Sequence, residues 1–235
     1  MTAFLLGNII FISVWVLLFI FSPKTRKLQL LGSLLLIPFG FLDVFFRPDY
    51  WNPPLFIKAI EPLSIETLLY CFSAGGIVAA VAGNFTKTFK LEKVRWYNLL
   101  LFFVSGFILF AIFKFFTSLN AMNSLNFAFL IIWLVLIVFN LKAVAKSLST
   151  GLVFTILTIV AVNIGLLFFP GFVSDYWNLA KNWPLFLNTP AEEIFFAGIL
   201  GALWTLLPDF TTKRFFGFRR SIRHFDNLIE RRRKG

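Results

Sequence analysis

Two acidic residues stand at matching places in the chain, each a short distance after a repeated tetrapeptide. The repeat is DYWN, at 49–52 and again at 175–178, and the acids that follow it are Glu66 and Glu193. Each Glu opens a long apolar run. A carboxylate at membrane depth is costly and marks a candidate functional site. In an apolar pocket a carboxyl group favours its neutral form, and a protonated carboxyl group is a general acid. The pair predicts proton-donating chemistry inside an apolar protein.

Two further acids lie close to these positions. Asp43 stands near the end of an apolar run, and Glu192 directly precedes Glu193. Adjacent residues project about 100° apart on a helix, so we expect one of the two neighbouring Glu side chains to face the interior. The match with Glu66 in the first copy favours Glu193.

A simpler interpretation of these acids stays open. Pro62 and Pro190 fit the first turn of a helix, where a missing N–H costs nothing. An acid in that turn also complements the helix dipole. By this reasoning the Glu residues only mark where two helices begin.

Each copy of the repeated tetrapeptide contains a Tyr and a Trp. Aromatic faces attract cations, so these rings could stabilise a carbocation in a dry site. The alternative is the belt of Trp and Tyr that membrane proteins place at the headgroup level. Combined with the acids, the loops favour proton-initiated chemistry on a polyene-like substrate. The candidate binding residues are Asp43, Tyr50, Trp51, Asn52, Tyr176, Trp177 and Asn178.

The elements that must position these residues are membrane helices. The chain has 235 residues, 59% of them hydrophobic, with a mean hydropathy of +0.84. About 20 apolar residues of helix cross a bilayer. We therefore predict an all-α polytopic membrane protein with seven transmembrane helices. The predicted spans are about 3–21, 29–46, 62–82, 97–117, 121–140, 148–169 and 190–208.

Charge fixes the predicted orientation. Lys and Arg gather in the segments after the first, third and fifth spans and in the C-terminal tail. Such residues stay on the cytoplasmic side. We expect a multi-pass protein of the cell membrane, with its N-terminus outside and its C-terminus in the cytoplasm.

The repeat also predicts how the helices are grouped. The two DYWN segments are 126 residues apart, and four spans separate them, so both face the same side. This pattern indicates two parallel three-helix repeats related by an axis along the membrane normal. Two such units in one orientation need an odd helix between them. The predicted segments are 1–86 (first repeat), 87–120 (linker helix), 121–210 (second repeat) and 211–235 (basic cytoplasmic tail).

Several classes of ligand are disfavoured. The net charge of +11 follows from membrane topology, so we expect no nucleic acid. One Cys (Cys71) and one His (His224) exclude a disulfide framework and an ordinary Cys/His metal site. No dinucleotide fingerprint or P-loop occurs, and no metal or cofactor is expected. The tail mixes apolar and basic residues, which favours contact with anionic lipid or, alternatively, a disordered end that only fixes topology.

Taken together, the motifs resemble a known family. An Asp at a helix end (Asp43), a Trp–Asn loop that occurs twice and a Pro-x-Glu-Glu helix start (190–193) resemble the lycopene cyclase domain family of small integral-membrane carotenoid cyclases, whose pattern repeats all three features. The two copies read FLDVFFRPDYWNPPLFIKAIEPLSIETLLYCF and DYWNLAKNWPLFLNTPAEEIFFAGILGALWTLL. Such enzymes close the ends of linear lycopene into rings by protonating the terminal double bond, without net redox change.

The resemblance implies roles for individual residues. Glu192 and Glu193 match the Pro-x-Glu-Glu pair of the second copy, and Glu66 matches the second Glu of the first. Asp43 matches the helix-end Asp, and Trp51 and Asn52 match the loop. The implied partner is a membrane-resident apolar polyene. Since the family includes two-subunit forms, a homo-oligomer or hetero-oligomer stays open.

The chain also departs from the family pattern. Ile65 stands where the first copy would have its first Glu, and Phe169 stands where the second copy would have its helix-end Asp. An incomplete acidic set keeps a second hypothesis open, namely a non-catalytic seven-helix carrier or scaffold that binds lipid or isoprenoid.

Overall fold

The computed structural model describes residues 2–54, 58–60, 63–84, 95–178 and 185–212. Pro62, the basic segment 85–94 and the tail from residue 213, where anionic lipid was expected, lie outside the described residues. Within them the chain is mostly helical. The helices are α1 (Ala3–Phe21), α2 (Arg26–Gly40), α3 (Asp43–Asp49), α4 (Ile65–Asn84), α5 (Trp96–Phe116), α6 (Ala121–Val138), α7 (Val144–Phe168), α8 (Phe172–Tyr176) and α9 (Ala191–Thr212).

Two short strand pairs precede the helices that carry the Glu residues. Strands β1 (Lys58–Ile60) and β2 (Leu63–Ser64) pair antiparallel just before α4. Strands β3 (Leu185–Phe186) and β4 (Thr189–Pro190) do the same before α9. Leu187 and Asn188 both have positive φ, as a two-residue hairpin turn requires. Pro190 therefore ends a strand instead of lying in the first helical turn.

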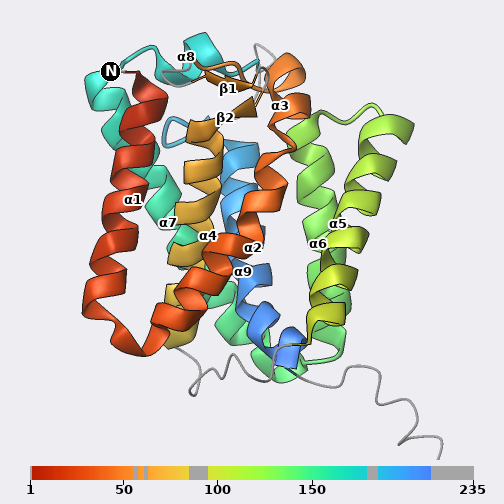
Figure 1. Cartoon of the computed structure of the whole chain (residues 1–235). Coiled ribbons are helices and arrows are strands. Elements are labelled where there is room, and N and C mark those ends of the chain that lie inside the picture. The colour runs from red at the N-terminus through yellow and green to blue at the C-terminus, as the bar shows by residue number, and fades with distance from the viewer. Residues whose placement is uncertain (1, 55–57, 61–62, 85–94, 179–184, 213–235) are drawn as a thin grey trace, which may run out of the picture.

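Six of the described helices are long and apolar enough to cross a membrane: α1, α4, α5, α6, α7 (together with the 3₁₀ turn Leu141–Ala143 before it) and α9. The remaining predicted span, 29–46, is broken into α2 and α3. Pro38 lies in the last turn of α2, and Phe41 and Leu42 donate to carbonyls three residues back, those of Pro38 and Phe39. A Pro in this place removes a backbone donor and disrupts the regular helix. Figure 1 shows α2 and α3 following one another across the height of the bundle.

The helices form one bundle with α4 and α9 at its centre (Figure 1). About two thirds of the α4 span and 76% of the α9 span are buried, against 17% for α1 and 22% for α5. Helix α2 packs along α4, α7 packs along α9, and α4 and α9 contact each other. Trp204 of α9 is buried in the core, where its indole donates to the Gly32 carbonyl of α2 at 3.4 Å.

The outer sides of the bundle are apolar. Leu17 of α1, Phe116 of α5 and Leu167 of α7 are largely exposed. A helix that is apolar all round must be buried in protein or in lipid. Since these sides face outward, the six helices have the surface of a membrane protein.

An ion pair ties two segments together at one end of the bundle. Lys114 of α5 forms an ion pair with Asp49, the Asp of the first DYWN segment. The Asp49 carboxylate also accepts from the backbone N–H of Ala121, at 3.1 Å to Oδ2. A carboxylate at this place caps the N-terminus of α6 and complements its dipole. The first DYWN segment is thereby held against the turn between α5 and α6.

Candidate functional site

A cavity of about 150 Å³ lies inside the bundle. It is lined by residues of α1, α2, α4, α6, α7 and α9 and of the segments α3 and α8. A dry cavity of about this size, lined by apolar side chains, holds a molecule such as benzene. Aromatic rings form much of the wall, namely those of Phe4, Phe11, Phe39, Phe46, Trp51, Tyr70, Phe129, Phe172, Trp177 and Phe196.

Glu193 is one of the two acids that line this cavity. It lies in the first turn of α9 and is half-buried. The indole N–H of Trp177 donates to Glu193 Oε1 at 3.3 Å. Trp177 belongs to the second DYWN segment and also lines the cavity. The repeated loop therefore orients the acid that follows it.

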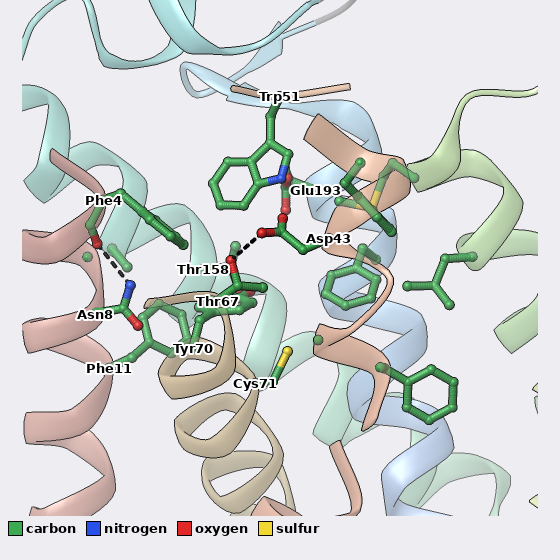
Figure 2. Close-up of a pocket in the computed structure, with 18 of the residues that line it drawn as sticks. Phe4, Asn8, Phe11, Asp43, Trp51, Thr67, Tyr70, Cys71, Thr158 and Glu193 are labelled. Atoms are coloured by element: carbon green, nitrogen blue, oxygen red, sulfur yellow. Dashed lines mark hydrogen bonds between the residues drawn. The ribbon is translucent and has the colours of Figure 1, made fainter. Parts of the chain in front are cut away.

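Asp43 is the second acid of the cavity wall and is almost fully buried. Its Oδ2 accepts from Arg47 Nε and from the Thr67 hydroxyl, both at 3.0 Å. Thr67 is in turn held by Ser64, whose hydroxyl oxygen accepts from the Thr67 backbone N–H at 2.9 Å. Asp43 Oδ1 has no donor among the described residues. Figure 2 shows Asp43 bonded to Thr67 on one side and near Glu193 and Trp51 on the other.

The two DYWN segments pair with each other. Asn52 N donates to the Tyr176 carbonyl at 2.7 Å, and Asn178 N donates to the Tyr50 carbonyl at 2.8 Å. Trp51 and Trp177 form the antiparallel bridge between these bonds, with their ring centroids 5.6 Å apart. The exchange is reciprocal, since the Asn of each copy donates its backbone N–H to the Tyr carbonyl of the other copy. Two segments far apart in the sequence thus make one roof over the cavity.

The predicted binding residues separate into two groups. Trp51, Trp177 and Asp43 line the cavity. Tyr50 is fully buried beside Glu193 and Trp177. Tyr176 packs on Phe172 instead, with ring centroids 6.0 Å apart. The side chains of Asn52 and Asn178 are exposed, and their backbone N–H groups make the bridge described above.

The matching of Glu66 with Glu193 is wrong by one residue. Glu66 is the second residue of α4 and Glu192 is the second residue of α9. Both are buried and neither lines the cavity. The third residues, Thr67 and Glu193, both line it. Helix position decides which side a residue faces, so Thr67 is the structural counterpart of Glu193, at the same spacing of 126 residues as DYWN.

Sequence reasoning missed several polar groups of the site. Asn8, Tyr70 and Thr158 line the cavity. A second internal repeat points to the first of them, because Asn-x₆-Trp occurs at 8–15 and again at 126–133. In both copies the Trp indole donates to a Ser hydroxyl, from Trp15 to Ser33 at 2.9 Å and from Trp133 to Ser147 at 2.7 Å.

The buried Tyr50 phenol gives a pH-dependent prediction. Burial raises the pKa of Tyr50 well above its ordinary value of 10.0, and the negative charges of Glu193 and Glu192 raise it further. The unfolded chain loses this proton near pH 10 while the folded chain keeps it, so stability is lost as the pH rises above that value. We expect the thermal unfolding midpoint in detergent to decrease as the pH is raised from 9 to 11. This decrease should be smaller in Tyr50→Phe than in the parent chain. Equal slopes would contradict this contribution of Tyr50.

Comparison of the chain with protein-family models, with curated proteins and with solved structures finds no match.

Proposed function

We propose that the protein is a membrane-embedded isoprenoid cyclase of the lycopene cyclase type, in which Glu193 protonates the end of a polyene. One observation carries the proposal: a carboxylic acid opens into a cavity of about 150 Å³, and aromatic rings form much of the wall of this cavity. A cavity of this size fits one six-membered ring. The end group of the polyene would enter the cavity, and the rest of the polyene would stay outside it.

The residues of the cavity support each step of a ring closure. Glu193, oriented by Trp177, gives its proton to the terminal double bond and leaves a tertiary carbocation. The neighbouring double bond attacks this cation, which forms the ring bond and moves the positive charge into the ring. Loss of a ring proton then restores a double bond. Substrate and product are isomers, so no oxidant or reductant is consumed.

Two features of the wall serve the charged intermediates. Trp51, Trp177 and Phe172 line the cavity, and aromatic faces attract cations most strongly where water is excluded. Asp43 Oδ1, which lacks a donor among the described residues, is available to take the leaving proton. General acid and general base would then be two separate carboxyl groups.

The repeated architecture forms part of the same proposal. We infer seven crossings, with α2 and α3 together making one of them, and two parallel three-helix units on either side of α5. The reciprocal bonds between the DYWN segments support a two-fold axis between Trp51 and Trp177. An N-terminus outside and a C-terminus in the cytoplasm follow from the Lys and Arg residues.

The residues at equivalent positions of the two units do not share this symmetry. Thr67 in the first unit is equivalent to Glu193 in the second. Asp43 in the first unit is equivalent to Phe169 in the second. Each unit thus gives the cavity one acid at a different position. A symmetric site would place two acids alike, whereas this one separates a proton donor from a proton acceptor.

Production of the full chain in a lycopene-accumulating bacterium tests the proposal. We expect γ-carotene or β-carotene in the pigment extract, identified by chromatography and absorption spectrum. A strain that carries the empty vector is the control. Only linear lycopene, in cells whose membranes contain the protein, would count against cyclisation of this substrate.

A second candidate is a non-catalytic carrier or scaffold that binds an isoprenoid in the same cavity. Thr67 favours it, since a hydroxyl group stands where the counterpart in the other copy has an acid. A carrier would release its ligand chemically unchanged. Extraction and mass spectrometry of the lipids that co-purify with the chain distinguish the two candidates.

A further inference from the structure

The amide oxygen of Asn8 is a buried acceptor that the proposed ring closure does not use. Asn8 lies in α1, is 4% exposed and lines the cavity. Its Nδ2 donates to the Phe4 carbonyl at 3.0 Å, which settles the orientation of the amide and leaves Oδ1 as a pure acceptor. Figure 2 shows this oxygen on the side of the amide away from Phe4.

No donor of the described residues reaches Asn8 Oδ1. The two Thr hydroxyls of the cavity wall already donate elsewhere, Thr158 to the Phe154 carbonyl at 3.0 Å and Thr67 to Asp43 at 3.0 Å. Buried acceptors in folded proteins nearly always have a donor. The donor for Asn8 is therefore sought in whatever occupies the cavity.

The surroundings of Asn8 limit the chemistry of that occupant. Phe4 and Phe11 line the cavity on the same helix, so the body of the occupant is apolar. Helix α1 carries no acidic residue, and Figure 2 shows Asn8 away from Asp43 and Glu193. An ammonium group at Asn8 would therefore be buried against an uncharged amide, which is costly. A hydrocarbon polyene has no donor at all. A neutral hydroxyl group satisfies both conditions.

We propose that the cavity takes an isoprenoid whose end group carries a hydroxyl, and that this hydroxyl donates to Asn8 Oδ1. The inference rests on the proposed use of the cavity for an isoprenoid and names the substrate class more narrowly. Asn8 then selects a hydroxylated end group over a plain hydrocarbon one. A site built to bond a hydroxyl discriminates against the analogue that lacks it, because its own polar group is otherwise left unpaired.

Binding of two matched small probes tests the proposal. Geraniol and 2,6-dimethyl-2,6-octadiene share a ten-carbon skeleton and differ in one hydroxyl group. Their dissociation constants for the full chain in detergent are measured by calorimetry and referred to the concentrations inside the micelle. We expect geraniol to bind about tenfold tighter, the value of one buried hydrogen bond. Equal affinities would mean that water satisfies Asn8, and would overturn the proposal.

Two variants assign the preference to one atom. Asn8→Leu keeps the volume but removes the acceptor, and it should bring the affinity for geraniol down to that for the hydrocarbon. Gln29→Leu is the matched control. Gln29 is a buried amide that donates to the Trp15 carbonyl at 2.7 Å, its oxygen has no donor among the described residues, and it does not line the cavity. It should keep the tenfold preference. If Asn8→Leu does not fold, the comparison in the parent chain still decides.

The outcome of this binding test does not depend on the proposed reaction. A chain that converts lycopene but binds both probes equally keeps the cyclase assignment and loses the hydroxyl site. A chain that prefers geraniol but yields no cyclised product keeps the hydroxyl site and loses the cyclase assignment.

Discussion

Replacement of Glu193 by Gln should remove cyclised carotenoid from lycopene-accumulating cells. Gln keeps the size of the side chain and can still accept from the Trp177 indole, which lies 3.3 Å from Oε1. It cannot protonate a double bond. General acids contribute about 10²-fold to 10⁴-fold to the rate, so we expect product per membrane protein to fall at least about 100-fold. Chromatography of pigment extracts, normalised to protein in the membrane, measures it.

The control for this variant is another carboxylate of the same helix. Asp209→Asn makes the same change from acid to amide near the other end of α9, where Asp209 Oδ2 accepts from Asn140 Nδ2 at 2.7 Å. We expect it to retain product, since Asp209 does not line the cavity. Unchanged product in Glu193→Gln would remove Glu193 from the mechanism.

A second variant separates Glu193 from its neighbour. Glu192 is buried but does not line the cavity, and its backbone carbonyl accepts from Asn126 of α6 at 3.2 Å. The loss in Glu192→Gln should be smaller, less than about tenfold, as for a residue that acts through position alone. The reverse order of effects would assign the acid to Glu192.

Gly75→Ala should destabilise the bundle, although Ala is the better helix former. Gly75 of α4 faces Gly32 of α2. A Cβ added at Gly75 would collide with the Gly32 carbonyl oxygen and lie 2.8 Å from Leu36 Cβ. These are backbone and near-backbone atoms, so the two helices would have to separate. Overpacking of this kind costs about 1–3 kcal/mol, more than the ~1 kcal/mol that Ala gains over Gly in helix propensity.

The thermal unfolding midpoint in detergent measures this change. Gly7→Ala of α1 is the control, because a Cβ at Gly7 meets nothing within 4 Å. It should be neutral or slightly stabilising. Gly151→Ala in α7 should behave like Gly75→Ala, since its Cβ would lie 2.5 Å from the Gly198 carbonyl oxygen of α9. A midpoint for Gly75→Ala at or above that of Gly7→Ala would contradict the close packing of α2 on α4.

Close approach through Gly explains the tightest helix pairs of the bundle. Helices in lipid gain nothing from burying apolar surface against each other, so small residues that let backbones meet are favoured at their interfaces. Gly32 with Gly75, and Gly151 with Gly198, hold α2 on α4 and α7 on α9. These pairs fix the two central helices, and with them the acids at their starts.

The sequence by itself determined most of the helices. The predicted spans 3–21 and 97–117 agree closely with α1 (Ala3–Phe21) and α5 (Trp96–Phe116). A helix in an apolar environment satisfies its own backbone, so a long apolar run is enough to specify it. The sequence also pointed to Asp43, Trp51, Trp177 and Glu193, which all line one cavity. Each of these is a residue type that is unusual among its apolar neighbours.

Only the tertiary structure decided which of these residues meet. The break between α2 and α3 depends on local bonds after Pro38 that a hydropathy pattern does not resolve. The pairing of Trp51 with Trp177 joins segments 126 residues apart. Where α4 begins shows that Thr67, and not Glu66, occupies the position equivalent to Glu193. A shift of one residue rotates a side chain by about 100° around the helix. A match between the two sequence copies that is uncertain by one position therefore cannot distinguish a cavity residue from its buried neighbour. The packing of the helices determines which of the two side chains lines the cavity.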